Sequence, residues 1–239
     1  MKLSIIIATK DVELFLLRTI ASLKFIESDI EIVVVNGGDI ICNSKFKLYN
    51  NLKLIQEPDK NIYDAWNKGL AVACGDYVAF FGSGDLVRKD YFSRMHDSAL
   101  KTGADLILCK QMQWMEDGRP LRELGRPWVW KEFQKKFSIP HIGCWHKRAL
   151  FLQYGAFDDS FFVAGDYEWL LRVGKNIQSA FVDEVLVDVT VGGISDKGNR
   201  VFMESKRARK MHTDASEVDL FIGDYVYRVR KKVRKLLWG

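Results

Sequence analysis

The chain has 239 residues and a mass of 27.5 kDa, which fits one large domain with at most a small appendage and excludes a multidomain assembly. Hydrophobic residues make up 48% and charged residues 28%, with only four prolines, so disordered, collagen-like and low-complexity proteins are excluded. The net charge is +5, and six basic residues without any acid lie between residues 225 and 238. The positive charge is therefore a property of the C-terminal tail, and the remainder is close to neutral.

The cysteine pattern and the N-terminal sequence indicate the cellular compartment of the protein. The four cysteines, Cys42, Cys74, Cys109 and Cys144, lie more than thirty residues apart, which argues against a zinc cluster or a dense disulfide framework and favours a reducing compartment. The apolar run at residues 3–8 is too short for a signal peptide. No stretch reaches about 18 consecutive apolar residues, the minimum for a membrane-spanning helix. We therefore expect a cytoplasmic protein.

Strand and helix patterns alternate through the first hundred residues. Apolar, β-branched runs predict strands at residues 3–8, 31–35, 52–55 and 77–81. Helices are predicted through Leu14, Leu17, Ile20 and Ala21, and over residues 62–74, where Gly75 ends the helix. Strands that are nearly all apolar and alternate with helices predict an α/β fold with a mostly parallel sheet covered on both faces. Ligands of such sheets bind at the carboxyl ends of the strands.

The alternation weakens after about residue 100. Strands are predicted at residues 104–109, 180–182 and 185–191, a turn at 116–119, and helices at 147–154 and 166–173. Residues 196–219 are polar and charged, so we expect a linker or mobile loop there. The predicted organisation is a domain over residues 1–195, with halves at about 1–100 and 101–195, followed by this linker and a tail over 220–239.

Asp85 follows a buried strand and three small residues, Gly82, Ser83 and Gly84, and is expected at the ligand-binding edge of the sheet. A single carboxylate there can bind a divalent cation that also holds phosphate oxygens, because Mg²⁺ and Mn²⁺ take most of their ligands from substrate and water. A turn aspartate that caps the next helix is the alternative, since aspartate is preferred at both places. The sequence alone leaves both interpretations open.

Polar residues recur at the start of the helix predicted over residues 62–74. Asp64, Asn67 and Lys68 are spaced i, i+3 and i+4, so they share one face of that helix. Near a helix N-terminus, this face could contact a nucleotide or its phosphates. A solvated helix face is the alternative, and it is the more common meaning of such spacing.

Two acids begin the helix predicted over residues 166–173. Asp166 and Glu168 stand two positions apart and cannot share a helix face. Glu168 can pair with Arg172 at i+4, which leaves Asp166 free to point into a cleft as a general base. An Asp166 that caps the helix is the equally weighted alternative.

Five segments occur in the order and spacing of family 2 glycosyltransferases, which the chain resembles over about residues 3–195. The most specific is Asp-Lys-Asn-Ile-Tyr-Asp-Ala-Trp-Asn-Lys-Gly at residues 59–69, which is similar to a helix of the branch found in bacterial O-antigen, capsule and colanic-acid clusters. The other segments are residues 4–9, 33–38, 75–81 and 165–167.

The resemblance implies a GT-A fold and an inverting enzyme that transfers a sugar from a nucleoside diphosphate sugar, commonly a UDP-sugar. Asp85 matches the last carboxylate of the family's Asp-x-Asp type motif, which implies a divalent metal, Mn²⁺ or Mg²⁺, on the diphosphate. Asp166 matches the catalytic base that deprotonates the acceptor hydroxyl. A metal at the leaving group and a separate carboxylate at the acceptor fit the charges that develop in the reaction. The residues implied to bind the nucleotide and substrate are Thr9, Asn36, Asp59, Asp64, Asn67, Lys68 and Ser83.

The sequence departs from the family pattern near the expected diphosphate. An acid usually stands close before the position of Asp85, and this chain has only glycines and Ser83 there. Asn36 stands where the family frequently has Asp. These departures leave a second hypothesis open, which is a catalytically degenerate protein that binds nucleotide sugars.

Two further features lie on the acceptor side of the resemblance. His141 and His146 precede the Asp166 segment and are expected near the acceptor, where a hydrogen-bonded structural histidine is the plainer interpretation. Residues 192–195, Gly-Gly-Ile-Ser, resemble a family loop that follows the last core strand, and the loop could close over the donor or its diphosphate, since consecutive glycines let backbone approach a ligand or hinge.

The tail over residues 220–239 predicts an amphipathic helix with an interfacial character. Six cations flank its apolar stripe, which consists of Ile222, Val226, Val229, Val233, Leu236 and Leu237. We hypothesise that the tail binds the anionic inner face of the cell membrane and brings the protein, as a peripheral enzyme, to a lipid-linked saccharide acceptor. A helix packed on the body or on a partner chain is the alternative. A nucleic-acid partner is not expected, because the body has no basic stripe.

Overall fold

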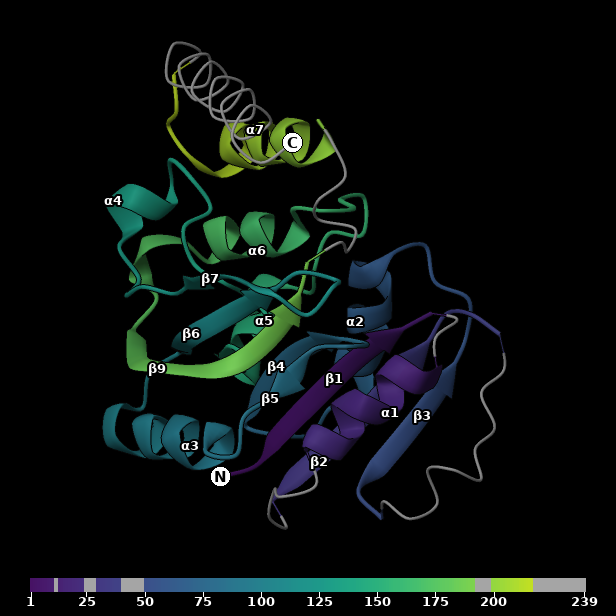
Figure 1. Cartoon of the computed structure of the whole chain (residues 1–239). Helices are drawn as coiled ribbons and strands as arrows, with labels where there is room; N and C mark the ends of the chain where they lie inside the picture. The colour runs from purple at the N-terminus through teal and green to yellow at the C-terminus, as the bar shows by residue number, and fades with distance from the viewer. Residues whose placement is uncertain (11–12, 24–28, 40–49, 192–198, 217–239) are drawn as a thin grey trace.

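Figure 1 shows the computed structural model, which describes residues 1–10, 13–23, 29–39, 50–191 and 199–216. The strands are β1 (Leu3–Thr9), β2 (Ile30–Asn36), β3 (Leu52–Gln56), β4 (Tyr77–Gly82), β5 (Leu86–Val87), β6 (Leu106–Trp114), β7 (Pro120–Leu124), β8 (Trp145–Lys147) and β9 (Ser179–Thr190). The helices are α1 (Glu13–Ser22), α2 (Ile62–Val72), α3 (Tyr91–Thr102), α4 (Trp130–Phe133), α5 (Arg148–Tyr154), α6 (Gly165–Val173), the 3-10 turn η2 (Gly174–Asn176) and α7 (Arg200–His212).

One sheet runs through both halves of the chain in the order β3-β2-β1-β4-β8-β6-β9-β5, and β7 pairs with β6. β1 is parallel to β2 and β4, β2 is parallel to β3, and β6 is parallel to β9. β8 lies antiparallel between β4 and β6, so β6 and β9 run in the same direction as the first four strands. The expected mostly parallel sheet is confirmed, and the short strand β8 joins its two halves.

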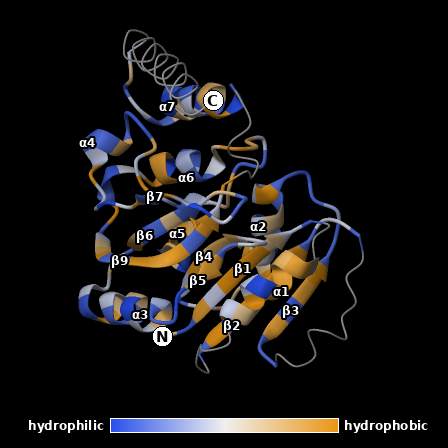
Figure 2. Ribbon diagram, viewed as in Figure 1, coloured by the Kyte–Doolittle hydropathy of each residue, from blue (hydrophilic) through white to orange (hydrophobic). Residues whose placement is uncertain are grey.

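The strands β1, β2 and β4 are buried because helices cover both faces of the sheet. Alternate side chains point to opposite faces, so Ile6 and Phe80 enter one core while Ile5 and Phe81 enter the other. Helix α2 covers the first face, and α1 and α3 cover the second. Figure 2 shows the apolar strands enclosed in this way. Each such side chain contributes about 1.5–3 kcal/mol by its burial.

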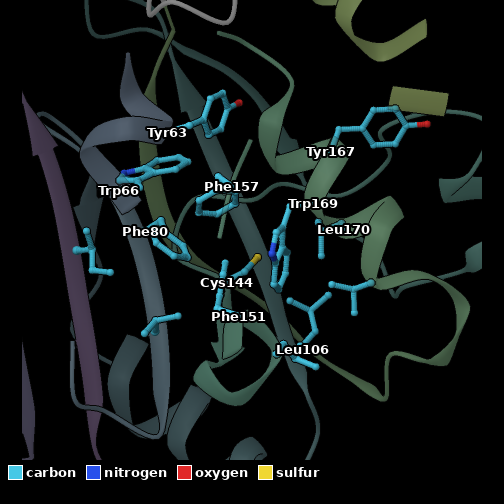
Figure 3. Packing of buried hydrophobic residues seen from close by; sticks show 14 of the residues in the cluster. Tyr63, Trp66, Phe80, Leu106, Cys144, Phe151, Phe157, Tyr167, Trp169 and Leu170 are labelled. Carbon is cyan, nitrogen blue, oxygen red and sulfur yellow. The ribbon is translucent and has the colours of Figure 1, made fainter. Parts of the chain in front are cut away.

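Aromatic rings fill the space between α2, β4 and the helices of the second half (Figure 3). Phe157 contacts Trp66 of α2 and Trp169 of α6, with ring centroids 5.7 and 5.9 Å apart. Phe151 of α5 stacks on Trp169 at 4.0 Å and 15°. Because such a cluster is close-packed, it fixes the position of α6 relative to α2.

Helix α7 lies where a linker or mobile loop was expected, so that prediction was wrong for residues 200–212. The helix packs against α6 and buries Glu204, Ala208 and Arg209. Glu204 and Arg209 are charged, and they form hydrogen bonds with the backbone of Ala164 and of Gln134. These hydrogen bonds, and not an apolar stripe, hold the helix against the body. Residues 192–198 and 217–239, which include the predicted Gly-Gly-Ile-Ser loop and the tail, lie outside the described residues.

The sequence patterns also missed α3 and the short strands β5, β7 and β8. Helix α3 buries Tyr91, Met95 and Ala99 at the spacing i, i+4 and i+8, a helical pattern that is present in the sequence and was overlooked. Strands β5 and β8 have two and three residues, too few to show alternation, and β7 is exposed along nearly its whole length and so has no apolar run.

Candidate active site

Two predicted nucleotide-binding residues end adjacent strands. Thr9 of β1 and Asn36 of β2 are register partners, and they are 5% and 1% exposed. Asn36 donates from Nδ2 to the carbonyl of Asp39 at 2.6 Å and accepts from the N–H of Gly38 at 3.2 Å, so it shapes the turn after β2. Thr9 Oγ1 is buried and has no hydrogen-bond partner among the described residues. A buried hydroxyl without a hydrogen bond costs folding free energy. The carboxyl edge of the sheet therefore offers a hydrogen-bonding group that a ligand can use.

Asp59 lies against the turn that follows β2. A Cβ atom on Gly37 would be 1.6 Å from Oδ2 of Asp59, so the carboxylate occupies the space that any side chain at position 37 would need. The N–H of Gly37 donates to the carbonyl of Thr9 at 3.1 Å, which ties the turn to the end of β1. The structure therefore brings Thr9, Asn36 and Asp59 together, as predicted for the donor side.

The turn after β4 carries Ser83 and Asp85 at the same edge, because β4 pairs with β1 in the register Gly82 to Ala8. Ser83 Oγ is buried without a partner among the described residues. Asp85 is 8% exposed and accepts the N–H of Gly82 at 2.7 Å. Burial raises the pKa of Asp85 to about 7, against a smaller lowering by that hydrogen bond. Asp85 therefore closes its own turn, whereas the next helix, α3, has Asp90 at its N-cap.

The N-terminus of α2 is closed by its own side chains. Asn61 is the N-cap and accepts the N–H groups of Tyr63 and Asp64 at 2.9 and 3.2 Å. Asp64 accepts the N–H of Lys60 at 2.9 Å and lies 3.6 Å from Nζ of Lys68. These contacts fix the loop before α2. The role of Asp64 and Lys68 toward a nucleotide stays a prediction.

Asn67 joins α2 to the segment between α5 and α6. Its Nδ2 donates to the carbonyl of Phe157 at 2.8 Å, and its Oδ1 accepts the N–H of the same residue at 3.0 Å. The three residues predicted to share one face of α2 therefore have different partners. Asn67 contacts the second half of the chain, whereas Asp64 and Lys68 contact the loop that precedes α2. Sequence spacing could not show this, because Asn67 and Phe157 are 90 residues apart.

Asp166 lies in the first turn of α6, and α2 holds its carboxylate. The Tyr63 hydroxyl donates to Oδ1 at 3.1 Å, and the N–H of Tyr167 donates to the same atom at 2.8 Å. Oδ2 faces His141, whose Nδ1 is 4.0 Å away. The N-cap of α6 is Ala164, so the structure does not support the capping alternative for Asp166.

The environment of Asp166 suits a base. Its side chain is 13% exposed, and burial raises its pKa to about 6, against the lowering effect of the hydrogen bonds from Tyr167 and Tyr63. The carboxylate is therefore ionised at neutral pH and still basic enough to accept a proton. The predicted pair of Glu168 with Arg172 is confirmed at 2.7 Å.

Tyr63 is a site residue that the sequence reasoning missed. It stands inside the most specific family segment, but nothing in the sequence connects it with Asp166, 103 positions away. A Cβ atom on Gly165 would lie 2.9 Å from the ring of Tyr63, so a glycine is required where α6 meets α2. The close contact between the two helices sets the distance from Tyr63 to Asp166.

His141 and His146 are buried with ring centroids 4.9 Å apart. Burial lowers the pKa of His146 to about 4, and burial together with the neighbouring His146 lowers the pKa of His141 well below its usual range. Both rings are therefore neutral at physiological pH. The hydrogen-bonded structural role expected of them stays a prediction: no ring nitrogen has a close partner within the described part of the chain, while backbone groups of Cys144 and Val78 partly offset the lowering of the His146 pKa. His141 instead stacks on Phe80 and presents a neutral ring to Asp166.

Comparison with known sequences gives the family. The model of the family described as "Glycosyl transferase family 2" matches residues 4–162. The chain belongs to this family, as the resemblance of its motifs predicted.

Individual relatives are similar over part of their length. EpsH and EpsJ of Bacillus subtilis (strain 168), both named as glycosyltransferases, are 29% and 30% identical over 120 and 122 residues, which is 48% of this chain in each case. These alignments span 35% and 36% of the two relatives, about a third of their length. A glycosyltransferase of Mycobacterium bovis (strain BCG / Pasteur 1173P2), named for PGL/p-HBAD biosynthesis, is 26% identical over 62% of this chain and 59% of its own.

Solved structures of Staphylococcus aureus TarS have the same fold. The crystal structure of TarS 1–349 superposes with a TM-score of 0.71 at 18% identity, over 95% of this chain and 72% of that fragment. The complex of the same fragment with UDP-GlcNAc gives a TM-score of 0.70 at 20% identity, over 92% and 70%. The expected GT-A fold is confirmed.

Tyr63→Phe should raise the pKa of Asp166, because the hydroxyl stabilises the ionised carboxylate. A hydrogen bond of about 0.5–1.5 kcal/mol corresponds to a rise of roughly 0.4–1 pH unit. The measurement is a ¹³C NMR titration of the Asp166 carboxyl. Tyr77→Phe is the matched control, since it removes another buried hydroxyl, bonded to the carbonyl of Ala104, without contact to Asp166. An unchanged pKa in Tyr63→Phe would contradict the assigned contact.

Proposed function

We propose that this protein is an inverting glycosyltransferase that moves a sugar from a nucleoside diphosphate sugar to an acceptor hydroxyl. The observation that carries the proposal is Asp166, a nearly buried carboxylate with a pKa of about 6. Its Oδ1 accepts hydrogen bonds from Tyr63 and Tyr167, and its second oxygen, Oδ2, faces His141. Membership of glycosyl transferase family 2 supports the same reaction class.

A UDP-sugar is the proposed donor. The TarS structures of the same fold include complexes with UDP and with UDP-GlcNAc. Two buried hydroxyls, on Thr9 and Ser83, are without partners in the described chain and offer hydrogen bonds at the strand ends. The other proposed donor-binding residues are Asn36, Asp59, Asp64, Asn67 and Lys68.

Asp166 would act as the general base on the acceptor side. Oδ2 takes the proton of the acceptor hydroxyl while the hydroxyl oxygen attacks the anomeric carbon from the face opposite the diphosphate. The new glycosidic bond forms as the bond to the diphosphate breaks, which inverts the anomeric centre. Tyr63 holds Oδ1, so the carboxylate keeps its orientation during the transfer. The neutral ring of His141 adds no positive charge that would make Asp166 less basic.

Asp85 offers a divalent metal one protein ligand, so the other ligands must come from substrate and water. Asp85 is a buried carboxylate whose pKa is raised by burial, so a bound cation would stabilise its ionised form, and Mg²⁺ or Mn²⁺ can be held by one carboxylate with diphosphate oxygens and water. Among the described residues no group of three or more acidic, histidine or cysteine side chains could hold a metal without such help. When bound, the metal would neutralise the charge of the departing diphosphate.

Asp166→Asn should reduce turnover by about 100- to 10,000-fold while donor affinity is unchanged, because a base is lost and the donor residues are not. Turnover of the unaltered protein should fall as the pH drops through about 6, where Asp166 is protonated. Product formation and calorimetric titration with UDP-sugars measure the two effects.

The exposed carboxylate Asp97 of α3 provides the matched control, Asp97→Asn, which should leave both quantities unchanged. Full turnover in Asp166→Asn would contradict the role of Asp166 as the general base. Donor binding by the unaltered protein without any product formation would favour the degenerate sugar-nucleotide binder.

Asp85→Asn should abolish the metal response of donor binding and stabilise the fold at pH 8. Because its pKa is raised on folding, ionisation of Asp85 destabilises the folded state increasingly from about pH 4 to 7, and the full penalty remains at higher pH. The neutral amide removes the penalty, and the melting temperature should rise by about 2–4 °C for each kcal/mol regained.

At about pH 3 the stabilisation by Asp85→Asn should nearly vanish, since the carboxyl is then mostly protonated in both the folded and the unfolded state. Thermal melts at the two pH values, with Asp97→Asn in parallel, measure the effect. Donor binding that depends equally on Mn²⁺ before and after Asp85→Asn would contradict the metal assignment.

The proposed acceptor is a lipid-linked saccharide at the inner face of the cell membrane, in bacterial surface-polysaccharide assembly. Support comes from the six cations of the tail, each worth about 1 kcal/mol near an anionic surface. Within the described ranges, no helix has the length and apolar character needed to cross a bilayer. The proposed contact with the membrane is made by residues 220–239.

Deletion of residues 220–239 should abolish co-sedimentation with vesicles that contain phosphatidylglycerol. Replacement of the six tail cations by glutamine should weaken binding in the same direction, while neutral phosphatidylcholine vesicles should bind the intact chain poorly. Co-sedimentation that survives the deletion would contradict the role of the tail.

A further inference from the structure

Glu204 of α7 binds the backbone immediately before α6. Its Oε2 accepts three successive N–H groups, from Phe162, Val163 and Ala164, at 2.9, 2.8 and 3.1 Å. Its Oε1 lies 3.0 Å from Nε of Arg200, and the residue is 8% exposed. Successive backbone N–H groups that converge in this way form an anion-binding concavity, which a carboxylate of the protein itself fills here.

This concavity lies at the N-terminus of α6. Ala164 is the N-cap and has no side-chain hydrogen bond to offer, so its own N–H and those of the two residues before it take an acceptor from elsewhere. Glu204 supplies that acceptor from a helix 40 residues further along the chain. Its negative charge is also favourable at the positive end of the α6 dipole.

The first turn of α6 carries Asp166, so the same turn is held from two directions. Tyr63 of α2 holds the Asp166 carboxylate directly. Glu204 holds the backbone two residues before it. A second contact of α7, from His212 to Glu168 at 2.7 Å, lies in this first turn of α6. Helix α7 therefore restrains both the backbone that leads into this turn and the turn itself.

We propose that Glu204 is a positioning residue for Asp166, which it holds at the acceptor by fixing the backbone of residues 162–164. The inference rests on the proposed function, because it concerns the orientation of the proposed base. Glu204 touches neither donor nor acceptor in this assignment, so its loss should change turnover and leave donor binding intact. Its negative charge also contributes to the raised pKa of Asp166, after burial and in the same direction.

Two substitutions of Glu204 separate the effect of its oxygen, which accepts the three backbone hydrogen bonds, from the effect of its negative charge. Glu204→Ala removes both, and kcat should fall by about 10- to 100-fold, the effect of a small displacement of a reacting group, with KM and donor affinity unchanged. Glu204→Gln keeps an oxygen for the three N–H groups, so kcat should return to within about threefold of the unaltered value. The acid limb of its pH–rate profile should move to lower pH, because a negative charge near Asp166 is gone.

Met203→Ala is the matched control, since Met203 is the neighbouring residue of α7 and is 67% exposed. It should change neither kcat nor the pH profile. Thermal melts and calorimetric donor titrations show whether each variant is folded, and if Glu204→Ala does not fold, the pH shift in Glu204→Gln decides alone. Unaltered kcat in Glu204→Ala, or an unmoved acid limb in folded Glu204→Gln, would overturn the inference.

Asp166→Asn in the same assay distinguishes failure of this inference from failure of the proposed function. If Asp166→Asn is inactive and Glu204→Ala is fully active, the positioning role alone is wrong. If Asp166→Asn is fully active, the base assignment fails, and with it the role of Glu204 as its positioning residue.

Discussion

Burial of both faces of β1, β2 and β4 leaves the carboxyl ends of these strands as the part of the sheet where polar groups can meet a ligand. Within the sheet, successive side chains are committed to two apolar cores, where an unpaired polar group would lose its hydration. Where the strands end, Thr9 and Ser83 keep buried hydroxyls without partners in the described chain. This constraint supports the proposed place of the donor site.

Two carboxyl groups at this end of the molecule have raised pKa values for the same reason, which is burial. They differ in what holds them. Asp85 is bonded to the backbone of its own turn, whereas Asp166 is held by Tyr63 from another helix. A buried ionised group costs folding free energy, and groups of this kind are concentrated at functional sites. The separate environments suit the separate tasks proposed for them, Asp85 on the donor side and Asp166 on the acceptor side.

The geometry around Asp166 depends on the joint between α2 and α6. Asn67 ties α2 to the backbone of Phe157, and Gly165 lets the ring of Tyr63 approach α6. The aromatic cluster of Figure 3 fills the same joint, and Glu204 of α7 fixes its far side. A displacement of any of these contacts would move the base relative to the strand ends, which are anchored in the sheet.

The sequence by itself determined the features that depend on neighbouring residues. Apolar runs gave the central strands, their ends located the candidate donor edge, and the i, i+4 spacing of Glu168 and Arg172 gave a pair that the structure contains. Only the tertiary structure decided the contacts between distant residues, such as Tyr63 with Asp166 and Glu204 with the backbone before α6. Helix α7 was missed for the same reason, because charged side chains stabilise it through partners far away in the chain, and local periodicity carries no record of such partners.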